Sequence, residues 1–285
     1  MIIDGKQVAS KIIKEIKDKI SSLQTKPSIS VILVGNNLAS QTYVKMKKKA
    51  CENTDINFKL INLDDKISQE DLIEKIKSLN EDKMVDSILV QMPLPKHIDP
   101  TKVINSIDPS KDVDGFHPVN VGKLLIGDET GFVSCTPLGI KILLEESNID
   151  IKGKHVVIVG RSNIVGKPLF ALLIQKAKGA NATVTVVHSE TKNLKEITKT
   201  ADILVAAIGI AKFIKKDMIK ENAVVIDVGI NHEVQKDGTK KIFGDVDFEN
   251  VSKIASFITP VPGGVGPMTI AMLLSNILKS HIQKK

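Results

Sequence analysis

Two side chains with chemical potential lie one helical turn apart in the segment LASQTYVKMKKKA, at residues 38–50. Tyr43 is the single tyrosine of the chain, and Lys47 follows it four residues later, so the two share one face of a predicted helix. A tyrosine ring offers a flat surface to an aromatic ligand, and a lysine whose pKa is lowered by its surroundings exchanges protons near neutral pH. The neighbouring lysines favour the opposite interpretation, because lysine runs on helices are usually solvated. The spacing alone therefore does not decide whether Lys47 is a proton-transfer group or a solvated surface charge.

Three further segments place polar groups or glycines where a ligand could approach. Gln91 ends the predicted strand DSILVQM, and the carboxyl ends of parallel strands face the ligand crevice of α/β proteins. Its neutral amide would hydrogen-bond a lysine without fixing the lysine's charge. Asp112 and Asp114 flank Val113 in KDVDGFHP, where either could instead stabilise a glycine turn. The segment PVPGGVGPMT (260–269) has so little side-chain bulk that a ligand could approach its backbone closely.

The segment VVIVGRSNIVGKP holds the only arginine of the chain, Arg161, directly after a predicted strand. A strand-to-helix turn at this place binds the phosphates of a dinucleotide, although Gly160 and Ser162 match the common GxGxxG spacing poorly. A guanidinium binds the 2′-phosphate of NADP through two parallel hydrogen bonds, which a lysine cannot form. Glu190, just past the following strand, is the competing signal, because an acid there binds the ribose of NAD. We favour NADP and keep NAD as the alternative.

The hydrophobic pattern predicts the elements that must position these groups. Short β-branched runs, which we expect to be strands, cover residues 28–35, 58–63, 86–92, 154–160, 182–188, 201–209, 223–229 and 256–260. Amphipathic runs at 6–20, 38–50, 68–79 and 269–282 are predicted helices. Such alternation predicts parallel sheets with helices on both faces. The segment Asp108–Gly139, rich in Gly, Pro and Asp, is predicted to form loops and a domain crossing. We expect an α/β protein of two α/β domains flanking a cleft, the C-terminal one a Rossmann-type dinucleotide-binding domain.

Bulk composition narrows the class of protein. Hydrophobic residues make up 42% and charged residues 26%, which is ordinary for a soluble chain, and the net charge is +7. Aromatic residues are only 3%, so stacking platforms for single-stranded nucleic acid are scarce. Cys51 and Cys135 form no CxxC pair and the histidines are scattered, so neither a disulfide framework nor a metal site is predicted. Because no apolar run approaches the ~18 residues of a membrane span and the N-terminus is not a signal peptide, we expect a cytoplasmic protein without a membrane partner.

Several segments together resemble the motifs of the bifunctional methylenetetrahydrofolate dehydrogenase/cyclohydrolase family, the FolD family. In chain order they are YVKMKKKAC, VQMPLP, KDVDGFHPVNVGKL, CTPLGI, GRSNIVGKP, TKNL, VVIDVGIN and TPVPGGVGPMT. The runs DVDGFHPVNVG and PGGVGPMT are highly specific to this family, and GRSNIVGKP is fairly specific. The resemblance extends from about Tyr43 to the final helix. It strongly favours a catalytic role for Lys47 over a solvated surface position.

The resemblance implies a role for each candidate. Lys47 would be the catalytic lysine, Tyr43 the ring that stacks on the aminobenzoyl group of folate, and Gln91 the partner that hydrogen-bonds and tunes the lysine. Asp114 would anchor the pterin. The remaining implied contacts are Pro262, Gly263 and Gly264 for the folate, and Gly160, Arg161, Ser162, Ser189 and Ile230 for the cofactor.

By the same resemblance, the enzyme oxidises 5,10-methylenetetrahydrofolate to the 5,10-methenyl form with NADP and hydrolyses that product to 10-formyltetrahydrofolate, within one-carbon metabolism and purine biosynthesis. One folate site would serve both steps, because hydride transfer requires no general base whereas hydrolysis requires proton transfers. The implied domains are residues 1–120 with 268–285 for folate and 121–267 for NADP. The expected partners are tetrahydrofolate substrates with anionic polyglutamate tails, which suit a basic surface, and a second copy in a homodimer.

Two positions depart from the pattern of this family. Glu190 stands where many relatives carry a basic residue, and Ser134 stands where relatives often have proline. The glutamate weakens the assignment of NADP because a carboxylate repels a phosphate. Two alternatives remain open: a monofunctional NAD-dependent methylenetetrahydrofolate dehydrogenase, and, of a different class, a non-catalytic nucleotide- or nucleic-acid-binding module.

Overall fold

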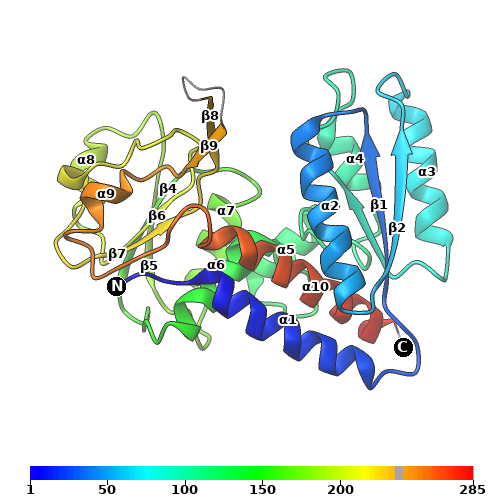
Figure 1. Ribbon diagram of the computed structural model, residues 1–285, viewed down its shortest axis with the longest axis horizontal. Helices are drawn as coiled ribbons and strands as arrows, with labels where there is room; N and C mark the ends of the chain where they lie inside the picture. Colours follow the sequence, from blue (N-terminus) through cyan, green and yellow to red (C-terminus); the bar gives the residue numbers. More distant parts are fainter. Residues whose placement is uncertain (235–239, 285) are drawn as a thin grey trace. The chain divides into compact units, whose positions relative to one another are not determined.

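The computed structural model describes residues 1–234 and 240–284 (Figure 1). Internal contacts divide the chain into two compact units. Unit 1 comprises Met1–Ser10 and Thr136–Thr269, and unit 2 comprises Lys11–Cys135 and Ile270–Lys285. No helix within the described ranges combines the length and the apolar character needed to cross a bilayer.

Unit 2 is built on a three-stranded parallel sheet. Its strands are β1 (Ser28–Val34), β2 (Asn57–Leu63) and β3 (Ser87–Val90), in the order β2-β1-β3. Strand β1 is buried along nearly its whole length because it is the central strand and carries the β-branched run SISVILV. The chain passes from β1 to β2 on one side and then returns to β3 on the other, which is the topology that opens a ligand crevice at the carboxyl ends of β1 and β3.

Helices cover both faces of this sheet, and α2 (Leu38–Asn53) and α3 (Gln69–Glu81) flank β1 and β2 in Figure 1. Helix α2 begins after Asn37, whose side chain accepts the N–H of Ser40 at 3.0 Å, and α3 begins after Ser68, which accepts the N–H of Asp71 at 3.0 Å. Four other helices in the described ranges lie wholly or mostly in this unit: α1 (Gly5–Ser21), α4 (Pro100–Ser106), α5 (Pro118–Ile126) and α10 (Val265–Gln283).

The loop predicted for Asp108–Gly139 is partly wrong, because α5 and the start of α6 (Cys135–Glu146) lie inside it. Local capping explains α5. His117 Nδ1 accepts the N–H of Val119 at 3.1 Å, and Pro118 occupies the first helical position, where its missing N–H costs nothing. Gly127 then ends the helix with a φ of 79°, in the left-handed region. The proline and the glycine that suggested loops therefore mark the two ends of a short helix.

Unit 1 contains a five-stranded parallel sheet in the order β10-β7-β6-β4-β5. The strands are β4 (His155–Val159), β5 (Thr183–Val187), β6 (Ile203–Ala206), β7 (Val224–Asp227) and β10 (Phe257–Ile258). Between them lie α7 (Gly166–Leu173), α8 (Leu194–Thr198), a short 3₁₀ helix η1 (Lys216–Met218), and α9 (Phe248–Val251). The antiparallel pair β8 (Asn231–Val234) and β9 (Lys240–Phe243) was not predicted from the sequence.

Along the chain, β4 is the first strand of this sheet, and in the sheet it lies between β5 and β6. That order is the one found in dinucleotide-binding folds, whose crevice opens beyond the carboxyl ends of the strands at this switch point. The predicted α/β class with two parallel sheets is therefore confirmed, and each predicted strand is present within a few residues of its expected bounds.

Candidate active site

A lysine and an amide meet at the carboxyl edge of the sheet of unit 2. Lys47, half-buried on α2, donates from Nζ to Oε1 of Gln91 at 3.0 Å. Gln91 directly follows β3, and its backbone N–H donates to the carbonyl of Ile32 on β1 at 2.9 Å. Its Nε2 donates to the carbonyl of Met92 at 2.7 Å, which fixes the amide so that Oε1 faces the lysine. Gln91 thus holds the Lys47 amine in place without supplying a negative charge.

The structure gives different surroundings to the two aspartates that residue type alone left as alternatives. Asp112 is buried, and its Oδ2 accepts the N–H of His117 at 2.8 Å and Nδ2 of Asn120 at 2.9 Å. Asp112 therefore stabilises the turn before α5. The carboxylate of Asp114 receives no hydrogen bond from any residue in the described ranges and lines a pocket instead. Asp114 is the aspartate whose oxygens are available to a ligand.

The electrostatic surroundings of Asp114 combine burial with two nearby charges. Burial raises the pKa of this carboxyl from 3.8 to about 6, while the Lys47 ammonium lowers it and the Asp112 carboxylate raises it. These influences place Lys47 and Asp114 within electrostatic range of each other. With a pKa of about 6, Asp114 is mostly ionised at neutral pH and accepts hydrogen bonds from the N–H groups of a ligand.

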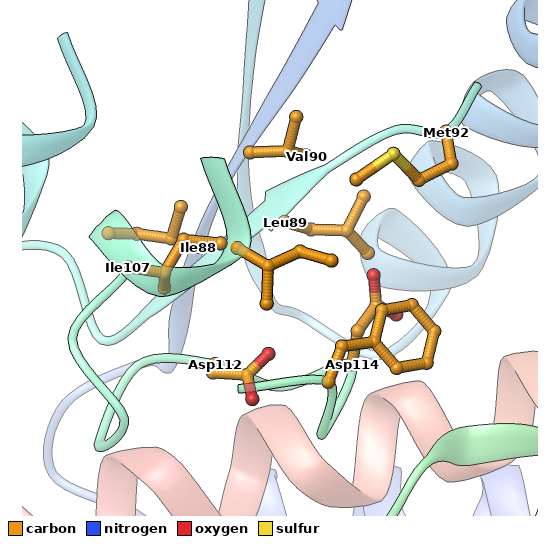
Figure 2. A pocket seen from close by; sticks show the side chains of 9 residues that line it. Ile88, Leu89, Val90, Met92, Ile107, Asp112 and Asp114 are labelled. Atoms are coloured by element: carbon orange, nitrogen blue, oxygen red, sulfur yellow. The ribbon is translucent and has the colours of Figure 1, made fainter. Parts of the chain in front are cut away.

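The pocket beside Asp114 in unit 2 is small, with a cavity volume of about 10 Å³, which is room for about one water molecule. Figure 2 shows Val90 and Met92 at one end and the two aspartates at the other. Its lining residues are Ile88, Leu89, Val90, Met92, Ile104, Ile107, Asp112, Asp114 and Phe116. Apolar walls with a few convergent polar groups are typical of small-molecule sites. At its volume, however, this pocket is too small to enclose a ring system, so it identifies the side chains around Asp114 and not the ligand.

Tyr43 lies on α2 one turn before Lys47, with 37% of its surface exposed. Partial burial raises the pKa of its hydroxyl, so the phenol is neutral at physiological pH. The two cysteines offer no comparable reactivity. Cys51 and Cys135 are free and buried, and burial raises the pKa of the Cys51 thiol to about 12 and that of Cys135 well above its usual range.

The predicted cofactor turn follows β4 in unit 1, at the switch point of its sheet. Gly160 has a φ of 125°, and a Cβ on it would lie 2.2 Å from the carbonyl oxygen of Ala207, which follows β6. A Cβ on Gly166 would likewise lie 2.2 Å from the carbonyl oxygen of Gly160. Gly166 therefore permits the close helix packing that the third glycine of GxGxxG usually provides, one position later than in that fingerprint. This shift explains why the generic spacing matched poorly.

The other cofactor candidates occupy loops at the same edge of the sheet. Arg161 is exposed, and Oγ of Ser162 accepts the N–H groups of Val165 at 3.1 Å and Gly166 at 3.4 Å, which begins α7. Ser189 and Glu190 follow β5, and the serine hydroxyl donates to Oε1 of the glutamate at 3.3 Å. Ile230 follows β7 and is 43% exposed.

The candidate loop with Pro262, Gly263 and Gly264 also belongs to unit 1, between β10 and α10. Gly263 has a φ of 111°, and the N–H of Gly264 donates to the carbonyl of Pro260 at 2.8 Å. A Cβ on Gly5 would lie 1.9 Å from the carbonyl oxygen of Gly264, so the N-terminal segment packs directly on this loop. The loop is a compact turn in which Pro262 is exposed, whereas Gly263 and Gly264 are buried.

Asn276 is a residue of the site that sequence reasoning missed. From α10 its Nδ2 donates to the carbonyl of Val113 at 2.8 Å and to that of Val133 at 3.0 Å. Asn276 thereby fixes the backbone of Val113, the residue between the two aspartates, although it lies far from Val113 in the sequence. The available signal was an asparagine within the largely apolar run at 270–278, where a buried amide requires hydrogen-bond partners.

Comparison with known proteins gives consistent results over the whole chain. The family model of the tetrahydrofolate dehydrogenase/cyclohydrolase catalytic domain matches residues 3–114, and that of the NAD(P)-binding domain matches residues 134–285. The bifunctional protein FolD of Protochlamydia amoebophila is 55% identical over 284 residues, which cover 99% of this chain and 97% of the relative. The FolD of a Hydrogenobaculum species is also 55% identical over 284 residues, with 99% of each chain covered.

Solved structures agree with these relatives. The bifunctional enzyme FolD from Campylobacter jejuni is 49% identical and superposes with a TM-score of 0.94, covering 100% of this chain and 99% of the other. The Trypanosoma brucei FolD, solved with NADP cofactor and an inhibitor, is 39% identical with a TM-score of 0.93 and covers 99% and 97% of the two chains. Together with the two family models, these similarities establish that the chain belongs to the tetrahydrofolate dehydrogenase/cyclohydrolase family of bifunctional enzymes.

Proposed function

We propose that this chain oxidises 5,10-methylenetetrahydrofolate to 5,10-methenyltetrahydrofolate with NADP and then hydrolyses the product to 10-formyltetrahydrofolate. Membership of the family supports both activities. The observation that carries the proposal is the 3.0 Å hydrogen bond between Lys47 and Gln91, close to a pocket lined by the Asp114 carboxylate, which receives no hydrogen bond from the residues that the structure describes. A positioned amine and a ligand-ready carboxylate are the groups that a folate hydrolysis site requires.

Each residue of unit 2 then has a distinct task. Asp114 accepts hydrogen bonds from the N–H edge of the pterin, since its carboxylate receives no hydrogen bond from the described residues. Tyr43 presents its exposed ring to the aminobenzoyl group. Gln91 accepts one N–H of Lys47 and leaves the rest of the amine free to exchange protons with water and with a folate nitrogen during hydrolysis.

The turn after β4 fits a dinucleotide, because Gly160 and Gly166 bring the strand, the turn and α7 into contacts that any Cβ would block. The residues that would hold the cofactor are Gly160, Arg161, Ser162, Ser189 and Ile230. The exposed Arg161 guanidinium suits a 2′-phosphate. NADP, when bound, accepts the hydride from the methylene carbon of the folate.

Several wider features belong to the same proposal. We place folate binding in residues 1–120 with 268–285 and cofactor binding in residues 121–267. We further propose that the enzyme is a cytoplasmic homodimer, that it acts on polyglutamylated folates, and that its 10-formyl product serves purine biosynthesis. The net charge of +7 supports the acceptance of anionic folate tails.

The decisive experiment replaces Lys47 by methionine, which keeps the length of the side chain and removes the amine. We expect cyclohydrolase activity on methenyltetrahydrofolate to fall by about 100-fold or more, the usual contribution of a positioned acid–base group. Dehydrogenase activity should fall less, because hydride transfer requires no proton transfer by the protein. Lys45→Met, at an exposed lysine of the same helix, is the matched control and should keep both activities.

Full cyclohydrolase activity in a folded Lys47→Met protein would refute the proposed role.

Glu190 is the observation that keeps an NAD-dependent, dehydrogenase-only enzyme as a second candidate, because its exposed carboxylate follows β5, where acids bind the ribose of NAD. Parallel assays with NADP and NAD, together with direct measurement of methenyl hydrolysis, distinguish the two candidates.

A further inference from the structure

A buried carboxylate in unit 1 holds the loop that packs against the cofactor turn. Asp245 is 0% exposed and lies between β9 and α9. Its Oδ2 accepts the backbone N–H groups of Ile208 at 2.7 Å and Gly209 at 2.9 Å. Its Oδ1 accepts Nδ2 of Asn231 at 2.9 Å. All three partners are donors, so the side chain at this position must accept on both oxygens, which a carboxylate does and an amide cannot.

A second buried carboxylate fixes the position of the first. Oδ1 of Asp227 accepts the backbone N–H of Asp245 at 2.8 Å, and its Oδ2 accepts that of Val246 at 3.0 Å. Two glycines allow the close approach. A Cβ on Gly244 would lie 1.8 Å from Oδ2 of Asp227, and a Cβ on Gly229 would lie 2.1 Å from Oδ1 of Asp245. Asp245 is therefore held in two ways: Asp227 accepts its backbone N–H, and its side chain accepts the three donors described above.

The loop held by Asp245 contacts the cofactor turn directly. Residues 207–210 follow β6, and the N–H of Ala207 donates to the carbonyl of Val159, the last residue of β4, at 2.9 Å. The carbonyl oxygen of Ala207 and Cγ2 of Ile208 are the atoms that a Cβ on Gly160 would meet, at 2.2 and 3.6 Å. The Gly160 backbone therefore contacts Ala207. The next two residues, Ile208 and Gly209, donate their backbone N–H groups to Asp245. A displacement of that segment would move the turn.

We propose that Asp245 is a positioning residue for the dehydrogenase step. Its carboxylate fixes the backbone of Ile208 and Gly209, and this segment in turn sets the place of Gly160 and Arg161 for cofactor binding. The inference rests on the proposed function, because it assigns the turn after β4 to NADP. It concerns unit 1 alone, and so it separates the two activities: cofactor binding depends on Asp245, whereas hydrolysis at Lys47 does not.

The test exploits the donor and acceptor pattern around Asn231. Asp245→Asn places an amide NH₂ group opposite either the NH₂ group of Asn231 or the two backbone N–H groups, so one set of donors loses its acceptor. The double variant Asp245→Asn with Asn231→Asp exchanges the two groups, so the relocated amide again accepts from the backbone and donates to the relocated carboxylate. Among the contacts of the described residues, the exchange loses the long bond from Asn231 Nδ2 to the carbonyl of Phe243, at 3.4 Å.

Binding of NADPH is measured by fluorescence titration, and cyclohydrolase activity is measured without any nicotinamide cofactor. For Asp245→Asn we expect the Kd for NADPH to rise by about tenfold or more, as for the loss of one charge-assisted hydrogen bond. Cyclohydrolase activity should stay at the wild-type level, and the double variant should recover most of the affinity. Asp217→Asn removes an exposed carboxylate of the same unit, paired with Lys195, and should change neither quantity.

Unchanged NADPH affinity in Asp245→Asn would overturn the inference, as would a parallel loss of cyclohydrolase activity or a double variant no better than the single one. If Asp245→Asn does not fold, Asn231→Asp tests the same contact, because it sets two carboxylates against each other and should weaken NADPH binding with hydrolysis intact. A wild-type protein that binds no NADPH contradicts the proposed function itself, and this outcome is distinct from all the others.

Discussion

Replacing Asp114 by asparagine preserves the shape of the side chain and removes a charge for which the folded chain provides little compensation. The carboxylate lines a mostly apolar pocket and receives no hydrogen bond from the described residues, and burial raises its pKa from 3.8 to about 6. A raised pKa means that folding is penalised when the group is ionised. We therefore expect Asp114→Asn to be more stable than the natural chain at neutral pH, although it should bind folate poorly.

The magnitude follows from the two pKa values. Above pH 6 the carboxyl is ionised in both the folded and the unfolded chain, and the rise from 3.8 to about 6 corresponds to an upper limit of roughly 3 kcal/mol. Asp114 keeps partial solvent contact, so we expect about 1–2 kcal/mol in favour of the variant. Below the unfolded value of 3.8 the carboxyl is neutral in both states. The advantage of the variant should therefore shrink as the pH falls, to roughly half at pH 5 and little at pH 4.

Urea denaturation of both proteins at pH 7.5, 5 and 4 measures this difference from the midpoints at equal slope. Asp18→Asn, at an exposed position on α1, is the control and should shift the midpoint little at any pH. The functional counterpart is a raised KM for methylenetetrahydrofolate in Asp114→Asn. In the natural chain the same KM should rise as the pH falls below about 6, where Asp114 becomes protonated. A variant no more stable at pH 7.5, or one with an equal advantage at pH 4, would show that the reasoning is wrong.

Two further variants test other parts of the molecule. Arg161→Ala should raise the KM for NADP far more than that for NAD, because the guanidinium is expected to bind only the 2′-phosphate; equal effects in parallel assays would overturn this assignment. Lys111→Met should lower the free energy of unfolding by about 2–3 kcal/mol, because the buried Nζ donates to the carbonyls of Leu79, Asn80 and Asp82 at 2.9, 2.7 and 2.9 Å, at the end of α3. An unchanged urea midpoint would mean that water satisfies those carbonyls equally well.

The sequence predicted well what depends on local pattern. The β-branched runs became strands and the amphipathic runs became helices, because burial on one or both faces imposes a period that the sequence displays. The family was recognised from its motifs, and the two family models confirm it. Lys47 and Gln91 lie within hydrogen-bonding distance, as the resemblance implied, although their roles stay predictions.

Features that depend on tertiary contacts were not accessible in the same way. Composition could not distinguish Asp112 from Asp114, because the difference lies in partners such as Asn120, which folds back onto one carboxylate only. The importance of Asp245 was hidden for a similar reason, since the N–H groups that it accepts precede it by more than thirty residues. Helix α5 was missed because its capping residues were also the residues that indicate loops.

The two sheets nevertheless position their candidate residues by the same rule. In each unit the first strand lies centrally, the second lies on one side and the third on the other, so the loops after the first and third strands meet at one edge. Lys47 lies on α2, the helix that follows β1, and Gln91 directly follows β3, so their hydrogen bond crosses that edge. Gly160 follows β4 and Ala207 follows β6, and their backbones meet in the same way.

What differs between the two edges is their chemistry. In unit 2 an amine and an amide form a hydrogen bond, and we propose that the amine transfers protons, whereas in unit 1 two backbone segments are in contact at the turn that we assign to a dinucleotide. Strand order alone decides which loops meet, and the residue types in those loops decide what the meeting point can do. In an α/β sequence of this topology, polar residues that follow the first and third strands are therefore the pairs to test first for a shared site.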